Sequence, residues 1–329
     1  MVKMKIVDVS TFDDEAFATL IGGVIDNDRF DLVRAGKDAS EEDIIELVRD
    51  AVIILTDPIH IRPVTRRIID AADNLKLIQC YTIGFDDVDI EVARERGVPV
   101  ANAAGTLSEP IAEYTIAVAL QLLKPIWYAS SELHKGNWVQ QELLAPPMLA
   151  LELGVLTMGI IGCGSIGQAV ARLAKGFGTR ILYHKRNRLS EEVERELGLN
   201  YSSLDDLLAS SDVLSINVPL TDETRKMIGA EEIAKMKAGA VLINTARGEV
   251  VDYGALADAL KSGHLRGAAI DVFENEPNIE DCPLLGLGNV ILTPHSSAIS
   301  SESPRRCMEK VAENLSLFYE GKPLLNVVN

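Results

Sequence analysis

Short apolar runs alternate with amphipathic segments along most of the chain, and this pattern predicts strands that alternate with helices. In the first hundred residues the runs expected to form strands lie at 5–9, 31–34, 51–55, 76–81 and 98–101. Helical periodicity occupies the intervals between them, at about 13–24, 41–50, 63–73 and 87–96. Such alternation is typical of a small open parallel sheet wound with helices.

A second alternating region follows a long helical stretch, expected at about 108–135, and an extended arm at 136–151. Its strands are expected near 157–161, 180–183, 212–218, 240–245, 268–272 and 290–293. The last helix, at about 303–319, comes too late to belong to that second sheet. We therefore expect it to return to the first domain, which makes that domain discontinuous.

A glycine-rich loop lies between a strand and a helix in the second region. Gly162, Gly164 and Gly167 follow an apolar run ending at Ile161 and precede a helical segment, with Ser165 and Ile166 between them. The first glycine permits a tight turn, the second lets the backbone approach a pyrophosphate, and the third allows close packing of helix on strand. The loop predicts a dinucleotide-binding domain.

The predicted fold is therefore α/β, with two doubly wound parallel-sheet domains. A Rossmann-type cofactor domain at 102–296 is inserted into a smaller, flavodoxin-like substrate domain made of 1–101 and 297–329. Ligands of open α/β sheets bind beyond the carboxyl ends of the strands. Three such ends in the cofactor domain lead into Arg247, Glu276 and His295. Singly these residues could be surface or capping residues, but their shared position beside a dinucleotide loop indicates a catalytic site.

Composition and charge narrow the possible functions. The chain has a hydrophobic fraction of 47%, a charged fraction of 25% and a formal charge of −17. This charge argues against nucleic acids and anionic membranes as partners, and an anionic substrate would need a local cation such as Arg247. The apolar stretch from Thr115 to Leu123 is too short to span a bilayer, so a cytoplasmic location is expected. The four cysteines lack metal-ligand spacing, and no metal site is expected.

Several motifs in order resemble the D-isomer-specific 2-hydroxyacid dehydrogenase family over nearly the whole chain. They are Gly159–Gly167, Asn217–Thr221, Asn244–Asp252, Asp271–Phe273 with Glu276-Pro277, and Thr293–His295. The resemblance implies an NAD(P)-dependent dehydrogenase that transfers a hydride between a nicotinamide and a small 2-oxo or D-2-hydroxy acid.

The resemblance also implies a role for each site residue. Arg247 would hold the substrate carboxylate and polarise the carbonyl, while His295 would exchange a proton with the carbonyl oxygen. Glu276 would orient the imidazole and favour its charged form. The backbone N–H groups of Ile83 and Gly84 would meet the substrate carboxylate, and Asp271 would bind the nicotinamide carboxamide. Further cofactor contacts are expected from Val218, Pro219, Thr224, Thr245 and Ala246.

The cofactor preference is predicted from the segment after the second strand of the cofactor domain. An NAD-selective site usually has an acid there for the ribose 2′-hydroxyl. This chain has Lys185, Arg186 and Arg188 instead. Three cations suit a 2′-phosphate, so NADP is expected, with NAD possible. A solvated basic strand end is the alternative interpretation.

The substrate type and the assembly state are the last predictions. The basic segment resembles that of glyoxylate/hydroxypyruvate reductases, and the absence of a C-terminal regulatory domain weakens a phosphoglycerate-type assignment. A non-enzymatic, dinucleotide-sensing corepressor and a formate dehydrogenase are the alternatives, but the tails or extensions typical of those proteins are missing. The apolar surface of the 108–135 helix and its arm predicts a homodimer.

Overall fold

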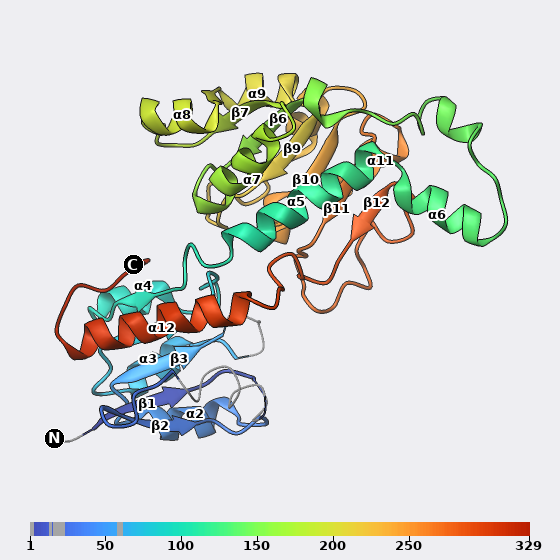
Figure 1. Ribbon diagram of the computed structural model, residues 1–329. Helices are drawn as coiled ribbons and strands as arrows, with labels where there is room; N and C mark the ends of the chain where they lie inside the picture. The colour runs from blue at the N-terminus through green and yellow to red at the C-terminus, as the bar shows by residue number, and fades with distance from the viewer. Residues whose placement is uncertain (1–2, 13–14, 16–23, 58–61) are drawn as a thin grey trace. The chain divides into compact units, whose positions relative to one another are not determined.

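The computed structural model describes residues 3–12, 15, 24–57 and 62–329, and the chain divides into two compact units. The first unit comprises Met1–Leu107 and Ser300–Asn329, and the second comprises Ser108–Ile299. Both contain a parallel sheet with helices, which confirms the predicted fold class (Figure 1). The boundaries expected from the sequence were 101/102 and 296/297. The helix expected at about 13–24 lies almost entirely outside the described residues.

The first unit contains a five-stranded parallel sheet in the order β2-β1-β3-β4-β5. Its strands are β1 (Met4–Asp8), β2 (Phe30–Arg34), β3 (Ile53–Thr56), β4 (Leu77–Cys80) and β5 (Val100–Ala101). In the described part of this unit the helices are α2 (Glu41–Val48), α3 (Arg66–Ala71), α4 (Ile90–Glu95) and α12 (Ser303–Tyr319). Helix α12, red in Figure 1, is tied to this sheet because Asn314 Nδ2 donates to Gln79 Oε1 at 2.9 Å. Helix α12 therefore belongs to the first unit.

The second unit contains a seven-stranded parallel sheet in the order β12-β11-β10-β9-β6-β7-β8. Its strands are β6 (Thr157–Ile161), β7 (Arg180–His184), β8 (Leu199–Tyr201), β9 (Val213–Ile216), β10 (Val241–Asn244), β11 (Gly267–Ile270) and β12 (Val290–Leu292). Its α-helices are α5 (Ser108–Leu123), α6 (Ile126–His134), α7 (Ser165–Lys175), α8 (Glu191–Leu197), α9 (Leu204–Ser210), α10 (Ala230–Lys235) and α11 (Tyr253–Lys261). The order reverses between β6 and β9, which is the switch point where such sheets bind dinucleotides.

Sequence patterns explain why these elements form where they do. The central strands are mostly apolar and every residue in them is buried, as is typical of parallel strands covered by helices on both faces. Helix starts carry polar side chains that cap free backbone N–H groups; Ser40 and Asp43 form a capping box, and Asp252 accepts from Ala255 N. These local signals determine where the helices that follow the strands begin.

Two features differ from the sequence-based expectation. The helix expected at 108–135 is two helices, α5 and α6, because Pro125 lacks a backbone N–H and its ring disfavours a helical conformation in the preceding residue. The strand β8 was not predicted, because Leu199–Tyr201 has only three residues, too few to show a strand pattern in the sequence. In the described residues, no helix is both long and apolar enough to cross a membrane.

Candidate active site

The glycine loop joins β6 to α7 and has the geometry that a dinucleotide requires. Gly162 has a φ of +83°, and a Cβ there would lie 2.4 Å from the carbonyl oxygen of Asn217. A Cβ at Gly167 would lie 2.4 Å from the carbonyl oxygen of Gly162. The fold itself therefore demands glycine at both positions.

Gly164 is different, because no described atom lies within 4 Å of the position its Cβ would occupy. It is exposed and precedes α7, whose first turn receives no side-chain cap. The protein's own packing does not require a glycine at this position. Open space in front of an uncapped helix N-terminus fits the close approach of a pyrophosphate, with Ser165 and Ile166 in the first turn of the helix.

The basic segment after β7 contains two kinds of cation. Arg188 donates from Nε and Nη2 to Glu194, both at 2.8 Å, and its guanidinium stacks over the ring of Tyr201. Hydrogen bonds from Arg188 and from the Tyr183 hydroxyl lower the pKa of Glu194 to about 2, while the same pairing raises the pKa of Arg188. Arg188 is thus held in a local structural cluster, which does not favour its expected role as a phosphate ligand.

Lys185 and Arg186 form no ion pair or hydrogen bond with any residue that the structure describes. Lys185 lies near the glycine loop: burial raises the pKa of the Cys163 thiol to about 11, and the positive charge of Lys185 opposes this rise. Arg186 lies near Glu223, whose pKa is lowered first by a hydrogen bond from Thr221 and also by the charge of Arg186. Lys185 thus lies beside the glycine loop, and Arg186 lies beside the segment that follows β9.

The segment that follows β9 leaves the sheet on the other side of β6 from the basic segment, because β9 and β7 both pair with β6. Val218 and Thr224 are half-buried, and Pro219 is exposed. The Thr224 hydroxyl donates to the carbonyl oxygen of Pro219 at 2.7 Å and accepts from Thr221 N at 2.8 Å. These bonds hold the turn in one conformation beside Gly162, which touches the backbone of Asn217.

His295 and Glu276 form a direct pair. Strands β10, β11 and β12 are neighbours and parallel, so their carboxyl ends meet at one edge. The distance between His295 Nδ1 and Glu276 Oε2 is 2.7 Å, and Phe273 N donates to Glu276 Oε1 at 2.6 Å. The His295 side chain is 41% exposed, whereas that of Glu276 is only 18% exposed. The imidazole is thus fixed at Nδ1 by a sheltered carboxylate and remains accessible.

The backbone around His295 is anchored by Asp271, at the end of β11. Asp271 is fully buried and accepts from the Thr293 hydroxyl at 2.6 Å and from Ser296 N and Ser297 N, both at 2.8 Å. The Asp271 carbonyl accepts from His295 N, and His295 has a φ of +49°. This uncommon conformation is maintained by the surrounding hydrogen bonds. The structure assigns Asp271 this anchoring contact, while its expected contact with the nicotinamide remains a prediction.

Arg247 lies on a loop whose shape is set by Asn244, the last residue of β10. Asn244 Nδ2 donates to the Arg247 carbonyl at 2.9 Å, and its Oδ1 accepts from Ala246 N at 3.0 Å. A Cβ at Gly248 would lie 2.3 Å from the carbonyl carbon of Phe273. The loop of Thr245–Arg247 therefore abuts the loop that leads to Glu276. Asn244 and Gly248 lie inside the motif Asn244–Asp252, but no sequence signal singled out these two residues as part of the site.

In the first unit, the loop after β4 has its carbonyl groups engaged and its amides available. The Thr82 carbonyl accepts from Ala103 N at 2.9 Å, and the Ile83 carbonyl accepts from Asn102 Nδ2 at 2.7 Å. No described residue accepts a hydrogen bond from Ile83 N or Gly84 N. Because N–H and C=O point in opposite directions across a trans peptide, these amides point away from Asn102 and Ala103. This is a suitable arrangement for binding a carboxylate.

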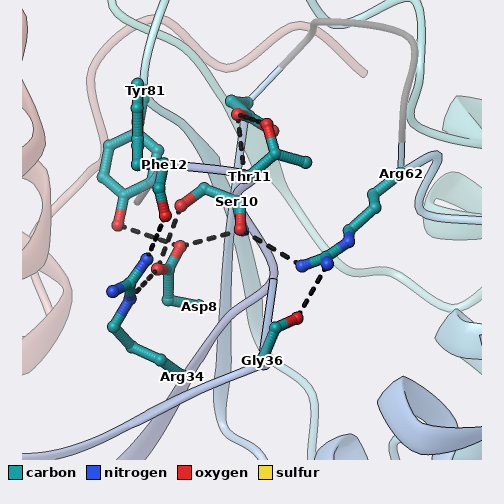
Figure 2. Close-up of polar contacts among 9 residues, drawn as sticks. Asp8, Ser10, Thr11, Phe12, Arg34, Gly36, Arg62 and Tyr81 are labelled. Carbon is teal, nitrogen blue, oxygen red and sulfur yellow. Dashed lines mark hydrogen bonds and ion pairs between the residues drawn. The ribbon is translucent and has the colours of Figure 1, made fainter. Parts of the chain in front are cut away.

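A buried polar cluster holds the start of that loop. Figure 2 shows Asp8 receiving hydrogen bonds from the Tyr81 hydroxyl at 3.3 Å, from Ser10 and from Arg34 Nε at 3.0 Å. Tyr81 N also donates to the Thr56 carbonyl at 2.9 Å. Burial and the charge of Asp8 raise the pKa of Tyr81 well above its usual value. Tyr81 thereby fixes the point at which β4 leads into Thr82.

A dinucleotide loop at a switch point, with a histidine–carboxylate pair beyond neighbouring strand ends, is typical of nicotinamide-dependent oxidoreductases. The sequence model described as "D-isomer specific 2-hydroxyacid dehydrogenase, NAD binding domain" matches residues 116–297. The chain belongs to this family, and it is an NAD(P)-dependent D-2-hydroxyacid dehydrogenase.

Three relatives illustrate the similarity. A glyoxylate reductase from Korarchaeum cryptofilum is 43% identical over 295 residues, which cover 88% of this chain and 86% of the relative. A D-lactate dehydrogenase from Aquifex aeolicus, solved with NAD and lactic acid, is 30% identical with a TM-score of 0.83, and the match covers 96% of each chain. An acyclic imino acid reductase solved with NADPH and D-Arg is 28% identical with a TM-score of 0.85, covering 99% of this chain and all of the other.

Proposed function

We propose that this enzyme reduces a small 2-oxo acid of the glyoxylate/hydroxypyruvate type, with NADPH as the preferred cofactor. The observation that carries the proposal is the 2.7 Å contact between His295 and Glu276, beyond the carboxyl ends of strands in the same sheet that carries the glycine loop. The substrate type is supported by the similarity to a glyoxylate reductase along most of both chains.

In the proposed reaction the nicotinamide, when bound, supplies the hydride to C2 of the 2-oxo acid. His295 holds a proton on Nε2 and gives it to the carbonyl oxygen, so that C=O becomes CH–OH. Glu276 accepts a hydrogen bond from the Nδ1–H of the imidazole, which keeps the ring oriented with Nε2 toward the substrate. In the reverse direction His295 accepts the hydroxyl proton.

The substrate carboxylate is proposed to meet Arg247 and the peptide N–H groups of Ile83 and Gly84. A guanidinium presents a planar, permanently charged fork that suits a carboxylate. It also provides the positive charge that a protein with a formal charge of −17 needs in order to bind an anion. The free amides of the loop after β4 add donors that do not depend on pH.

For the cofactor, Lys185 and Arg186 are the proposed ligands of the 2′-phosphate, since neither has an ion-pair partner in the described part of the chain. Arg188 is proposed to position this segment through Glu194 instead of contacting the phosphate. Val218, Pro219 and Thr224 would line the adenosine side. Thr245, Ala246 and Asp271 would lie on the nicotinamide side.

The test is a panel of glyoxylate, hydroxypyruvate, pyruvate and phosphohydroxypyruvate, each assayed with NADPH and with NADH at 340 nm. We expect the highest kcat/KM for glyoxylate or hydroxypyruvate with NADPH. Activity confined to the phosphorylated acid would contradict the substrate type. A higher kcat/KM with NADH at low salt would contradict only the cofactor preference.

We also propose that two copies of the chain form a homodimer through α6 and the arm that follows it. In this region Ile126, Trp127, Leu133, Trp138 and Leu144 are all more than half exposed, and both tryptophans are 74% exposed. A cluster of large exposed apolar side chains is typical of an interface. Replacing Trp127 with Glu should shift the mass measured by light scattering from dimer to monomer, and a monomeric wild type would contradict the proposal.

A cytoplasmic location is proposed on the evidence of the thiols. All four cysteines are unpaired, and burial raises the pKa of Cys80 to about 12, which keeps that thiol unreactive. Reduced thiols suit a reducing compartment. Cell fractionation with an antibody against the chain is the direct test.

A further inference from the structure

We propose that Asn102, buttressed by the C-terminal segment 325–329, is a positioning residue that aims the peptide N–H group of Gly84, next to that of Ile83, at the substrate carboxylate. This inference rests on the proposed function, because it assumes that a 2-oxo acid is the ligand of this loop. It assigns a task to the last residues of the chain, which are distant in sequence from the loop after β4.

Asn102 follows β5 directly, is only 3% exposed and uses both ends of its side-chain amide. Its Nδ2 donates to the Ile83 carbonyl at 2.7 Å, and its Oδ1 accepts from Ala104 N at 3.1 Å. Rotation of the amide would break both bonds, so the donor is locked toward Ile83. That bond fixes the plane of the Ile83–Gly84 peptide and hence the direction of Gly84 N–H.

The C-terminal segment holds Asn102 in place through its backbone. Asn102 N donates to the Asn326 carbonyl at 3.2 Å, and Asn326 Nδ2 donates to the carbonyls of Asn102 at 3.4 Å and Ala104 at 3.2 Å. Asn326 adopts a φ of +55°, a conformation that asparagine tolerates better than most residues. The segment is therefore shaped around Asn102.

The rest of the segment is attached to the first sheet and to α12. Ala101 and Val327 form an antiparallel bridge, and Val328 N donates to the Val100 carbonyl at 2.9 Å. Asn314 of α12 accepts from Leu325 N at 2.9 Å. A continuous series of hydrogen bonds thus runs from α12 through the C-terminal segment and Asn102 to the proposed carboxylate ligands.

The decisive variant is Asn102→Asp, which keeps the acceptor for Ala104 N but replaces the donor to the Ile83 carbonyl with an oxygen. We expect KM for glyoxylate or hydroxypyruvate to rise about tenfold or more, with kcat changed much less, because a hydrogen bond to a charged ligand loses its alignment. The dissociation constant of oxamate, an unreactive 2-oxo acid analogue, should rise in parallel in the NADPH complex. NADPH affinity should not change.

The matched control is Asn289→Asp. Asn289 Nδ2 also donates to main-chain carbonyls, those of Leu260 at 3.3 Å and Arg266 at 3.4 Å. Asn289 precedes β12, an edge strand of the second sheet, and so lies at the amino end of that strand. A purely structural role for such amides predicts the same loss of thermal stability in both variants and no change in KM or oxamate binding. The proposed role predicts a change of KM in Asn102→Asp only.

Asn326→Gly provides a second test that keeps the backbone conformation available while removing the side-chain contacts. We expect a smaller rise in KM and in the oxamate dissociation constant, in the same direction. If either folded variant leaves both constants unchanged, the positioning role is wrong even though the dehydrogenase remains. If the wild type binds oxamate but reduces no 2-oxo acid, the proposed function fails, while the effect of Asn102→Asp on oxamate binding still decides the positioning role.

Discussion

The two units place their proposed ligand-binding groups at the carboxyl ends of parallel strands in different ways. In the second unit the groups are charged side chains, and His295 is oriented by Glu276 at 2.7 Å. In the first unit they are the main-chain amides of Ile83 and Gly84. The orientation of each amide is set by the hydrogen bond that the carbonyl of the same peptide group accepts. Side chains can change protonation and so suit catalysis, whereas peptide groups keep one charge state and suit binding.

This difference decides what a substitution can reveal. Removing a charged side chain eliminates its chemistry directly. A peptide donor cannot be removed, so it must be disturbed through the residues that hold it, such as Asn102. Large effects on kcat are therefore expected in the second unit, and effects on KM in the first.

The largest effect should come from His295→Ala. Loss of the proton donor should lower kcat by roughly a hundredfold or more, since a positioned general acid contributes that much to proton transfer. NADPH binding, measured by its fluorescence, should remain nearly unchanged. A kcat close to that of the wild type would show that His295 is not the proton donor.

Arg186→Asp should give the next largest effect and extends the comparison to the cofactor. A charge-assisted contact to phosphate contributes on the order of 1.5–3 kcal/mol, so NADPH affinity should fall by roughly ten- to a hundredfold. NADH affinity should change little. The wild-type preference for NADPH should also decrease as salt rises, because exposed charges are screened. Equal losses for both cofactors would place Arg186 away from the 2′-phosphate.

The charged site was largely predictable from sequence, and the peptide site less so. Arg247, Glu276 and His295 each follow a recognisable strand end, and the topology of a parallel sheet brings such ends to one edge. The anchoring of His295 by Asp271 and the contact of Gly248 with Phe273 join loops far apart in sequence, so no local pattern reveals them. The direction of Gly84 N–H depends on the bond from Asn102 to the Ile83 carbonyl, and this alignment could only be established from coordinates.

Two further outcomes have the same explanation. Arg188 appeared equivalent to Lys185 and Arg186 in the sequence, but its partner Glu194 comes from the following helix. The break between α5 and α6 is signalled in the sequence by Pro125, but the helical pattern on both sides of this proline led to the prediction of one continuous helix. Sequence pattern and motif thus predict which residues lie at the carboxyl edge of the sheet. Contacts between elements then determine which of those residues are free to bind a ligand.

Two variants of the glycine loop should distinguish a glycine that packing requires from a glycine that the cofactor requires. Gly167→Ala places a Cβ 2.4 Å from a main-chain oxygen, so we expect a clear fall in melting temperature. Gly164→Ala meets no described atom within 4 Å. It should preserve the melting temperature and weaken NADPH and NADH binding alike, by about tenfold if the pyrophosphate lies against this residue. Unchanged binding of both cofactors in Gly164→Ala would contradict that position of the pyrophosphate.

The smallest effect is expected from Glu194→Gln, which tests whether a structural pair supports the ligand cations beside it. The variant loses the charge that pairs with Arg188, so NADPH affinity should fall a few-fold and the melting temperature should decrease slightly at pH 7. The pKa of Glu194 is lowered to about 2. Its contribution to stability is therefore complete above the unfolded value near 4.5 and is lost as the pH falls toward 2. The difference in melting temperature from the wild type should thus be smaller at pH 3 than at pH 7. Glu46→Gln, which removes an exposed pair with Arg49, should change neither property at either pH. A difference that does not depend on pH would mean that Glu194 acts through packing and not through its charge.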